Sequence, residues 1–512
     1  MRVDFVGHAT LLVRQGGLSL LSDPWWAGPA YRDQWYPWPI PVPERYDLSR
    51  LDAVYISHSH EDHLHAPTLR SLLQTAPDVL ALIPLRADTQ MRDYLRRIGF
   101  RRIREIASGS SFTLRHGHDR LRLTLFTHVD DSLIAVQSDH ETLLNLNDAL
   151  HSSRRELIIE YCRVLRRRFP RIDYLFCGFG GASYFPNCVH VPGKDDVAVA
   201  RARERFFLHN FLQIAQLLSP RFAFPFAAHF VLPDEQNWWI SEARLQLEPP
   251  SQTLRDQAPD SRIEFVDLQP GDYVEDGHVH QSAPRATGLP EPSVRVTRAT
   301  GRPSSSGSDA PRPVPEAARA EVLQRYGPAP ERPPLDAAAF ASLVDEIRSR
   351  AQSRAGPSLD AVLLLTDYPS QAIHVVVSPT DVQVEPVPTA AVASLNTQVV
   401  VQTRSDLVRS TLRSAFGKDL ISIGYGGQFH VRSRADLVSA PHDRVLQLLA
   451  PTPPRWRQQL RAHPWRTLRY LWGDPSMRYA LRRRLARRRQ PPDTSAEPAP
   501  YEIRDWVAVP ES

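Results

Sequence analysis

Cysteine is scarce in this 512-residue sequence, and its three copies stand apart from one another. Cys162, Cys177 and Cys188 form no Cys-x-x-Cys pair, which argues against a disulfide framework or a cysteine-rich zinc ribbon. So few cysteines suit a reducing compartment, and we expect a cytoplasmic protein.

Long apolar runs are also absent. No stretch of about 18 apolar residues is present to span a bilayer. Polar residues and a Gly-His pair interrupt the opening segment MRVDFVGHATLLV too early for a signal peptide. Apolar residues still make up 42% of the sequence, which is enough for globular domains with sizeable cores. We therefore expect a soluble protein.

Lysine occurs only at positions 194 and 418, so arginine carries nearly all of the positive charge. The formal net charge is +5, and much of the excess lies near the C-terminus. The charge therefore says little about a substrate bound near the N-terminus, and it indicates neither a nucleic-acid nor a membrane partner clearly.

A chain of this length is expected to form two or three domains, since a domain usually holds about 100–200 residues. In the first half, short apolar strands such as 51–57 alternate with amphipathic helices such as 156–169 and 196–218, which predicts a layered α/β domain. A segment rich in Pro, Ser and Gly then indicates a linker. The predicted parts are an α/β catalytic domain over 1–280, the linker over 281–316, a smaller α+β domain over 317–445 and an Arg- and Trp-rich tail over 446–512.

The strongest chemical signal is a motif of His58, His60, Asp62 and His63, directly after the predicted strand over 51–57. Neutral imidazole and carboxylate groups are ligands that zinc, iron and manganese accept. Four such groups on one loop cannot all bind a single ion, so we expect His58 and His60 to face one ion. Asp62 and His63 would then face another ion a few ångströms away. The alternative is a polar surface loop with chance histidines, and the apolar strand before the motif and the helix start after it argue against that.

A two-metal site needs further ligands, and three residues follow predicted strands in the same way. His128 comes after LRLTLF, Asp148 closes LLNLND, and His229 follows FAFPFAA. Because strand ends converge on one rim of a sheet, we predict that His128 completes the first ion, Asp148 bridges both and His229 completes the second. Any one of them alone would more often be a surface residue.

These motifs, with the opening GHAT, SDP and a later Gly-Ala-Ser stretch, resemble the metallo-β-lactamase superfamily. The branch is similar to the one with ascorbate-phosphate lactonases and with phosphodiesterases acting on N-acyl ethanolamine phospholipids. A closer similarity is to the catalytic domain of CMP-sialic acid hydroxylases. It runs through HEDHLHAPTLRSL, NLNDA, GFGGASYFP, the helical segment near 200–218 and PRFAFPFAAHF, and it covers roughly residues 1–280. The resemblance implies an αββα sandwich of two facing sheets, with helices outside and metals at one edge.

Two features depart from the hydroxylase pattern. The hydroxylases carry a Rieske iron–sulfur domain ahead of this fold, whereas this sequence opens on the first strand of the metal domain. Electrons would therefore have to come from another protein. The hydroxylases also have Tyr in the PFA segment where this chain has His229, and the hydrolases use a late histidine. His229 therefore favours a complete hydrolytic site.

Five further residues are candidates for substrate binding: His8, Asp23, Ser183, Tyr184 and Lys194. His8 and Asp23 match superfamily positions near the metal rim, where a supporting hydrogen bond or a turn is an equal alternative. The GGASYFP stretch is either a substrate contact or a plain turn. Lys194 either contacts an anionic group or is a solvated loop lysine.

We therefore predict a metallohydrolase with two divalent metal ions, zinc before iron or manganese, held in part by the catalytic carboxylates Asp62 and Asp148. Its substrate would be a small-molecule ester, lactone or phosphodiester, with an anionic group as one option. One alternative is an iron-dependent oxygenase with an external electron donor. Another is a non-enzymatic scaffold with a structural metal, which ranks last because structural zinc sites usually close with four ligands on one ion.

The C-terminal regions give weaker signals. The segment TRSDLVRSTLRSAFGKDLISIGYGGQFHV faintly resembles sterol-carrier-like α/β modules. The tail either binds an acidic membrane surface or nucleic acid, or packs its aromatic side chains on the second domain while its arginines stay in water. We expect the packed tail.

Overall fold

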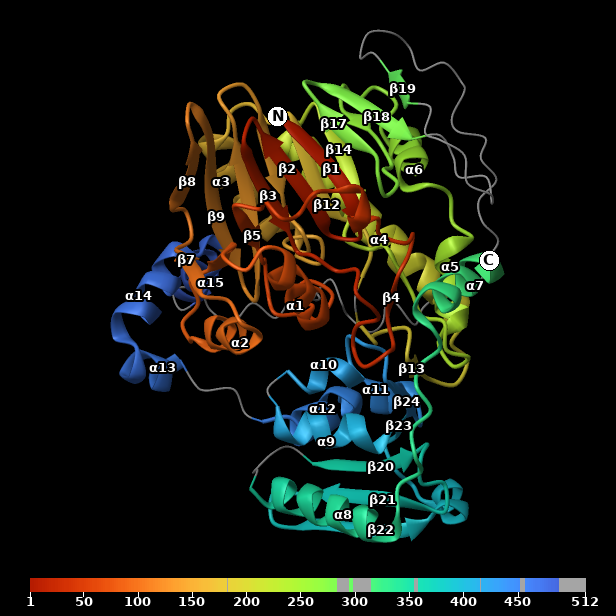
Figure 1. The fold of residues 1–512 in the computed structure, drawn as a ribbon. Helices are drawn as coiled ribbons and strands as arrows, with labels where there is room; N and C mark the ends of the chain where they lie inside the picture. Colours follow the sequence, from red (N-terminus) through yellow and green to blue (C-terminus); the bar gives the residue numbers. More distant parts are fainter. Residues whose placement is uncertain are drawn as a thin grey trace.

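The computed structural model describes residues 1–181, 183–282, 294–297, 315–353, 358–414, 416–451 and 456–487. Figure 1 shows a large upper part with two facing sheets and a smaller lower part built on one sheet. Most of the predicted linker and the end of the predicted tail lie outside the described residues. Among the described helices, none combines the length and apolarity that a membrane crossing requires.

Within the described ranges, the first sheet has nine strands in the order β19-β18-β17-β1-β2-β3-β5-β6-β7. Their bounds are β1 (Arg2–Gly7), β2 (Thr10–Gln15), β3 (Leu18–Ser22), β5 (Ala53–Tyr55), β6 (Leu80–Pro84), β7 (Arg102–Ile106), β17 (Tyr273–Glu275), β18 (His278–Ser282) and β19 (Val294–Thr297). The strands β3, β5 and β6 run parallel. Their carboxyl ends therefore meet at one edge of the sheet.

The second sheet has seven strands in the order β16-β14-β12-β11-β10-β9-β8 in the described part of the chain. Their bounds are β8 (Ser111–His116), β9 (Asp119–His128), β10 (Asp131–Gln137), β11 (Thr142–Asn145), β12 (Tyr174–Gly178), β14 (Phe222–Phe226) and β16 (Glu264–Phe265). β11, β12 and β14 are parallel neighbours. The chain segments that follow them leave the sheet on the same side.

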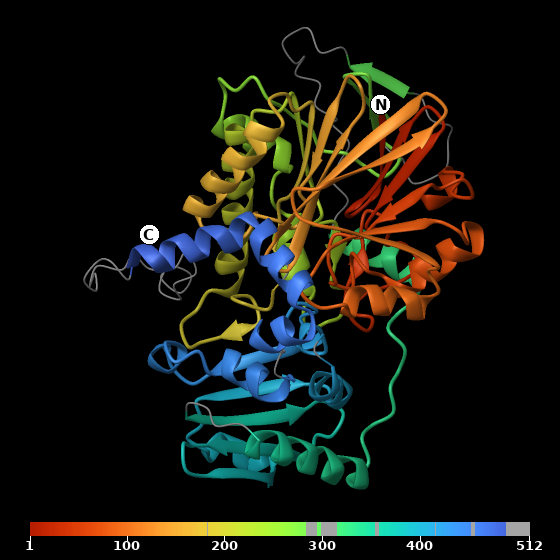
Figure 2. The same cartoon turned by 90° about the vertical axis from the view of Figure 1, so that its left-hand side faces the viewer.

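Helices cover both outer faces, and an apolar core lies between the sheets. The inner core joins residues such as Leu11 and Tyr55 of the first sheet to Leu123 and Phe176 of the second. On the first sheet lie α1 (Ala66–Thr75) and α2 (Gln90–Ile98), and on the second lie α3 (Arg155–Arg168) and α4 (Asp196–Leu218). Figure 2 shows helices on both sides of the strands. The predicted αββα sandwich is confirmed.

Smaller elements connect this sandwich to the rest of the chain. They are β4 (Tyr36–Pro37), β15 (Phe230–Val231), α5 (Trp238–Leu245), α6 (Pro250–Gln257), α7 (Pro315–Tyr326) and the 3-10 helices η1 (Pro43–Arg45) and η2 (Thr389–Ser394). The loop after β3 contains Trp25, Tyr31 and Trp35 and is called the aromatic loop below. β4, at the end of this loop, pairs with β15, which places the aromatic loop beside the segment that follows β14.

The lower part is a mixed six-stranded sheet in the order β13-β24-β23-β20-β21-β22, counted over the described residues. Its strands are β13 (Val189–His190), β20 (Leu359–Leu365), β21 (Gln371–Val377), β22 (Val382–Pro388), β23 (Val399–Thr403) and β24 (Gly427–Val431), and its helices are α8 (Ala337–Gln352), α9 (Ser405–Arg413), α10 (Lys418–Ile421), α11 (Arg434–Leu437) and α12 (Pro441–Leu449). Its edge strand β13 comes from the N-terminal half of the chain. One apolar core joins Trp25, Tyr31 and Trp35 to this sheet, so the two parts are packed as one body.

The described tail forms α13 (Trp456–Ala462), α14 (Pro464–Gly473) and α15 (Pro475–Arg487). These helices return to the sandwich, where α15 packs against α3 and β9. The expectation that the tail packs its aromatic side chains on the second domain is wrong for Trp465 and Trp472, which are 83% and 80% exposed. Polar contacts fix the tail instead, among them a bond between Ser476 and His128.

Candidate metal centre

The HSHEDH motif lies on the loop that leaves β5 and enters α1. Asp23, directly after the neighbouring strand β3, anchors the start of this loop. Its carboxylate accepts a hydrogen bond from the Ser57 backbone nitrogen at 2.7 Å and another from Ser57 Oγ at 2.7 Å. The motif is therefore held at the edge where the parallel strands of the first sheet end.

One group of potential ligands contains His58, His60 and Asp131, whose ligand atoms lie within 4.8 Å of one another. His58 Nε2 is 2.8 Å from His60 Nδ1 and 3.7 Å from Asp131 Oδ1. Asp131 opens β10, after the two-residue turn from β9. It comes from the second sheet, and it was not among the predicted ligands.

The other ligands surround His63. Asp148 Oδ2 lies 3.4 Å from His63 Nε2 and 3.9 Å from His58 Nε2, between the two halves of the motif. Asp62 Oδ2 lies 3.3 Å from His63 Nε2 and 3.0 Å from His8 Nε2. The structure therefore brings five predicted ligands together, and it adds His8 and Asp131 to them.

The environment of His63 fits a bound cation. Its Nδ1 donates a hydrogen bond to Asp23 at 3.0 Å, whereas its buried Nε2 makes no hydrogen bond although two carboxylates are close. Burial lowers the pKa of His63, but the charges of Asp62 and Asp148 outweigh burial and raise this pKa well above its usual value. The pocket thus favours positive charge at Nε2, which a metal ion can supply in place of a proton.

The protonation states of the other groups also suit ligands. Burial and the nearby histidines hold the pKa of His58 well below its usual value, so its imidazole is neutral. Burial opposes ionisation of Asp62 and Asp148, but the charge of His63 outweighs it and lowers both pKa values. Burial and the charge of Asp148 raise the pKa of Asp131 to about 6.

Neighbouring side chains orient Asp62. The Tyr31 hydroxyl donates a hydrogen bond to its Oδ1 at 2.6 Å, and burial and the charge of Asp62 keep the pKa of Tyr31 well above its usual value. The Tyr31 backbone nitrogen in turn donates to Glu61, whose pKa burial raises to about 7. His8, packed edge-on against Trp25, contacts the other oxygen of Asp62. Such supporting bonds fix ligand geometry before a metal binds.

His128, predicted as a ligand of the first ion, lies outside these groups in the described structure. Its Nδ1 bonds to Ser476 Oγ at 2.7 Å and its Nε2 to Ser153 Oγ at 2.8 Å. Both ring nitrogens are thus engaged by hydroxyl groups. Burial, with nearby His151 and Arg86, lowers the pKa of His128 to about 3, so the ring is neutral.

His229, predicted as a ligand of the second ion, is likewise not grouped with the other ligands among the described residues. Its ring packs against Phe5 and Phe179. Its backbone oxygen lies 3.3 Å from His8 Nδ1. Burial, with His8 and Arg244, lowers the pKa of His229 to about 3. His8 occupies the place beside Asp62 and His63 that was predicted for His229.

Most of the predicted substrate contacts have structural partners. The Lys194 side chain is 2% exposed, contacts Asp196 at 2.7 Å and donates to the backbone oxygens of Pro186 and Val189. The Tyr184 hydroxyl bonds to Asp443 of the lower part. Ser183 Oγ accepts a hydrogen bond from the backbone nitrogen two residues later. Asp23 is fully buried beside His63. These contacts hold loops in place.

Two residues near the centre were missed by the sequence analysis besides Asp131. His151 is buried, and its Nδ1 bonds to the backbone oxygen of Asp148. Asp419, in α10 of the lower part, is partly buried and lies close enough to His60 for their charges to interact. The spacing of NLNDALH carries a signal for His151, whereas nothing local in the sequence links Asp419 to a motif some 360 residues earlier.

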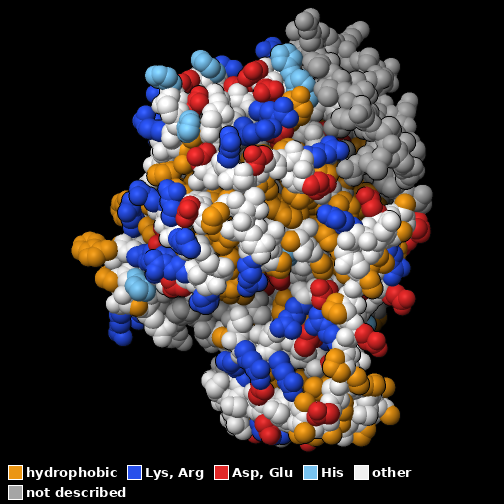
Figure 3. Space-filling view, in the orientation of Figure 1, with side chains coloured by type: hydrophobic (Ala, Val, Ile, Leu, Met, Phe, Trp, Pro, Cys, Tyr) orange, Lys and Arg blue, Asp and Glu red, His pale blue; other side chains and the backbone are white. Residues whose placement is uncertain are grey.

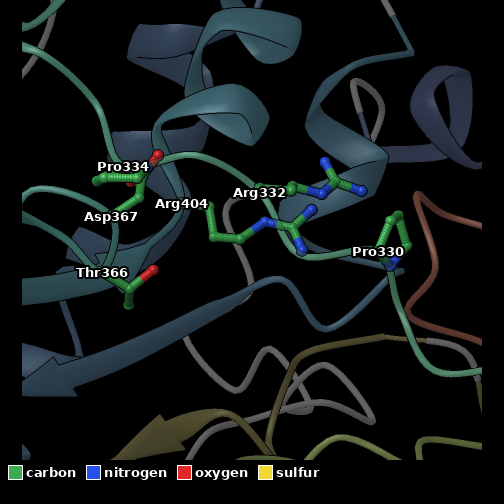
Figure 4. Close-up of a pocket in the computed structure, with 6 residues that line it drawn as sticks. All are labelled: Pro330, Arg332, Pro334, Thr366, Asp367 and Arg404. Atoms are coloured by element: carbon green, nitrogen blue, oxygen red, sulfur yellow. The ribbon is translucent and has the colours of Figure 1, made fainter.

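A separate pocket of about 360 Å³ lies along the segment that leads into the lower part. Figure 4 shows its lining residues, with the guanidinium groups of Arg332 and Arg404 near each other. Arg332 bonds to Asp33 and Asp406, which joins the aromatic loop after β3 to α9. None of its lining residues is one of the potential metal ligands.

Comparisons with known proteins agree with this part of the fold. Residues 19–146 match the family model described as Beta-lactamase superfamily domain. A Mycobacterium tuberculosis (strain ATCC 25618 / H37Rv) protein, whose name describes it as a Rieske 2Fe-2S iron–sulfur protein, is 29% identical over 214 residues, 40% of this chain and 39% of that protein. Cytidine monophosphate-N-acetylneuraminic acid hydroxylase of Danio rerio is 28% identical over 268 residues, 48% of this chain and 41% of the hydroxylase. The chain thus spans about two fifths of the length of these relatives.

Solved structures resemble about half of the chain. A diiron beta-hydroxylase from Streptomyces venezuelae aligns with a TM-score of 0.35 and 16% identity, covering 54% of each chain.

Proposed function

The N-terminal sandwich of this chain belongs to the metallo-β-lactamase superfamily, and from that premise we propose that the chain is a dinuclear iron-dependent oxygenase that hydroxylates a small molecule. The observation that carries the proposal is the group formed by His58, His60 and Asp131. Two imidazoles and one carboxylate with open positions are ligands typical of a non-haem iron ion that reacts with oxygen, and this group would hold one of the two ions.

The two other groups of potential ligands have the same composition. His8, Asp62 and His63 form one and His58, His63 and Asp148 form the other, so each again offers two imidazoles and one carboxylate. The relatives named above also carry redox names, one a hydroxylase and one an iron–sulfur protein.

Hydrogen bonds from neighbouring side chains orient the potential ligands of this site. Asp23 accepts a hydrogen bond from His63 Nδ1–H, which turns Nε2 toward the carboxylates. Tyr31 and His8 hold Asp62 from two sides. His58, His63 and Asp62 are nearly fully buried, whereas Asp131 is 20% exposed. The site is therefore closed to bulk water on the sheet side and accessible at Asp131.

When bound, two iron ions would supply oxygen-activating redox chemistry. Hydroxylation converts a C–H bond, dioxygen, two electrons and two protons into a C–OH group and water. The two electrons would come from a reductant, whose place a chemical reductant takes in the test below. Asp131, at the accessible side of the site, would give its carboxylate to the ion that His58 and His60 hold.

Hydrolysis of an ester, lactone or phosphodiester is the second candidate. The exposure of Asp131 favours it, because a hydrolytic site needs an open position for water. In that case zinc would supply hydroxide near neutral pH, and Asp148 would orient it.

Metal content and oxygen uptake decide between these candidates. The full chain is purified without added metal and analysed by mass spectrometry, then reconstituted with Fe(II) and given a chemical reductant in an oxygen electrode. We expect about two iron ions per chain and oxygen uptake that His58→Ala abolishes. His118→Ala, on an exposed turn, is the matched control.

A different pair of results would overturn the oxygenase in favour of the hydrolase. The chain would bind two zinc ions and take up no oxygen, and it would hydrolyse p-nitrophenyl esters or bis-p-nitrophenyl phosphate in a reaction that His58→Ala abolishes. Protein that binds neither metal would refute both candidates.

A further inference from the structure

The helix α14 presents large apolar side chains to solvent. Trp465 is 83% exposed, Leu468 49% and Trp472 80%. They are spaced three and four residues apart, which places them on one face of a helix. A contiguous exposed face of this kind usually marks an interaction site.

The opposite face of α14 is fastened to the sandwich. Arg466 donates to Glu105 Oε2 and to the Asp88 backbone oxygen, both at 2.8 Å. Thr467 is buried, and the Tyr470 hydroxyl bonds to the Val129 backbone oxygen at 3.0 Å. These contacts set the rotation of the helix about its axis. This rotation directs the two tryptophans away from the sandwich and into solvent.

Positive charge surrounds the apolar face. Arg457, Arg461 and Arg469 are exposed on α13 and α14. The acidic residue between 456 and 487 is Asp474 alone, and it is fully buried. Figure 3 shows a hydrophobic projection at the left edge of the molecule, over α14, with Lys and Arg side chains beside it. A partner for this surface must accept both apolar insertion and cationic contact.

We propose that the outward face of α14, defined by Trp465, Leu468 and Trp472, docks the chain on an anionic phospholipid surface. Tryptophan side chains favour the headgroup region of a bilayer, where the ring lies in the apolar boundary and the N–H stays wet. The neighbouring arginines meet lipid phosphates. Leu468 lies between the two tryptophans, and an aliphatic side chain there inserts into acyl chains but gains little from nucleic-acid bases. This inference does not depend on the reaction at the metal centre.

Docking would also orient the metal centre. Tyr470 contacts Val129, which lies two residues before Asp131 at the accessible side of the centre. α14 thus connects the docking face, on its outer side, to the turn that carries Asp131, on its inner side.

Vesicle sedimentation with the full chain tests the proposal. Vesicles of phosphatidylcholine and phosphatidylglycerol in a 3:1 ratio are compared with phosphatidylcholine alone at low and high salt. We expect binding to the anionic vesicles that weakens with salt. The double variant Trp465→Ser/Trp472→Ser should reduce the partition coefficient by roughly a hundredfold, and Arg469→Ser by several-fold. Val438→Ser, at a 67% exposed side chain of the lower part, is the matched control.

The variants alter exposed side chains, so their thermal unfolding should match that of the parent chain. Equal vesicle binding by the double variant, or no binding by the parent chain, would overturn the proposal. So would a dimer in solution that only the double variant abolishes, which would assign the surface to a second copy. Tighter binding to single-stranded DNA than to anionic vesicles, lost in the double variant, would assign it to nucleic acid.

Discussion

Asp131 and His128 face each other across the turn that joins β9 to β10, but Asp131 is the one grouped with His58 and His60. Asp131→Ala removes the carboxylate that completes this group. We expect metal content to fall from about two ions per chain to about one, as measured by mass spectrometry on dialysed protein.

Asp130→Ala provides the matched control, since Asp130 is the exposed neighbour on the same turn. It should keep the full metal content. An Asp131→Ala protein that still holds as much metal as this control would remove Asp131 from the ligand set and weaken the oxygenase proposal.

The raised pKa of Asp131 predicts how metal binding depends on pH. Burial and the charge of Asp148 raise this pKa to about 6, so the proton stays on the carboxyl below that pH and competes with the metal. Affinity for the first ion should be full above pH 7 and fall about tenfold per pH unit below 6. Equilibrium dialysis from pH 5 to 8 measures it. The Asp131→Asn side chain does not titrate in this pH range, so metal affinity of this variant should depend less steeply on pH. An equally steep pH dependence would contradict the assignment to Asp131.

The sequence could predict the gathering of His58, His60, Asp62 and His63, because these residues are neighbours in the chain and follow an apolar strand. Asp148 could also be placed near them, since the ends of parallel strands meet at one edge. Asp131 could not, because an Asp-Asp pair between two strands is equally typical of a tight turn. His128 is the more familiar ligand type, and only the three-dimensional structure shows that Ser153 and Ser476 engage both of its nitrogens.

At the scale of elements, His128 joins β9 to α15 and to the segment before α3. Ser476→Ala removes one of its two hydrogen bonds, and we expect the free energy of unfolding to fall by about 1 kcal/mol. Metal content should not change. Urea unfolding of Ser476→Ala, His128→Ala and the double variant forms a cycle in which the two effects should not add.

Additive effects in that cycle would show that the two side chains do not interact. A loss of metal in His128→Ala would restore His128 as a ligand, as the sequence analysis predicted.

Helices and strands whose own sequence carries a capping or periodicity signal were predicted well. The helix over 196–218 is α4, which begins after Asp195 because the Asp195 carboxylate accepts a hydrogen bond from the Ala198 nitrogen. The strand over 51–57 is shorter, ending at Tyr55, because the chain leaves the sheet to place Ser57 against Asp23. The docking of α15 on β9 was not predictable, since Ser476 and His128 are 348 residues apart and neither carries a pairing signal.

At the scale of the whole molecule, the sequence predicts a domain boundary at the Pro-, Ser- and Gly-rich linker, because the amino-acid composition changes there. The packing of side chains and strands in the structure does not divide the chain at that point. β13 lies within the predicted catalytic domain but is an edge strand of the lower sheet. Trp25, Tyr31 and Trp35 belong to the same core as Phe429 and Val401. Since Tyr31 also holds Asp62, the lower part supports the metal centre through this shared core.

This shared core predicts what happens when the chain is cut. A recognition site for a specific protease is inserted between Pro303 and Ser304, within the predicted linker and outside the described residues. After cleavage, the two fragments should elute together in size-exclusion chromatography and keep the metal content of the uncut chain. They are held by the β13–β24 pairing, the contacts of Arg332 with Asp33, and the bond between Ser476 and His128. The same sample should separate in denaturant, which controls for complete cleavage. Fragments that separate in native buffer would contradict the shared core, and an N-terminal fragment that keeps its metal after separation would show that the sandwich holds its metal centre without the lower part. Fragments that stay together but lose metal would contradict the expectation that packing alone preserves the centre.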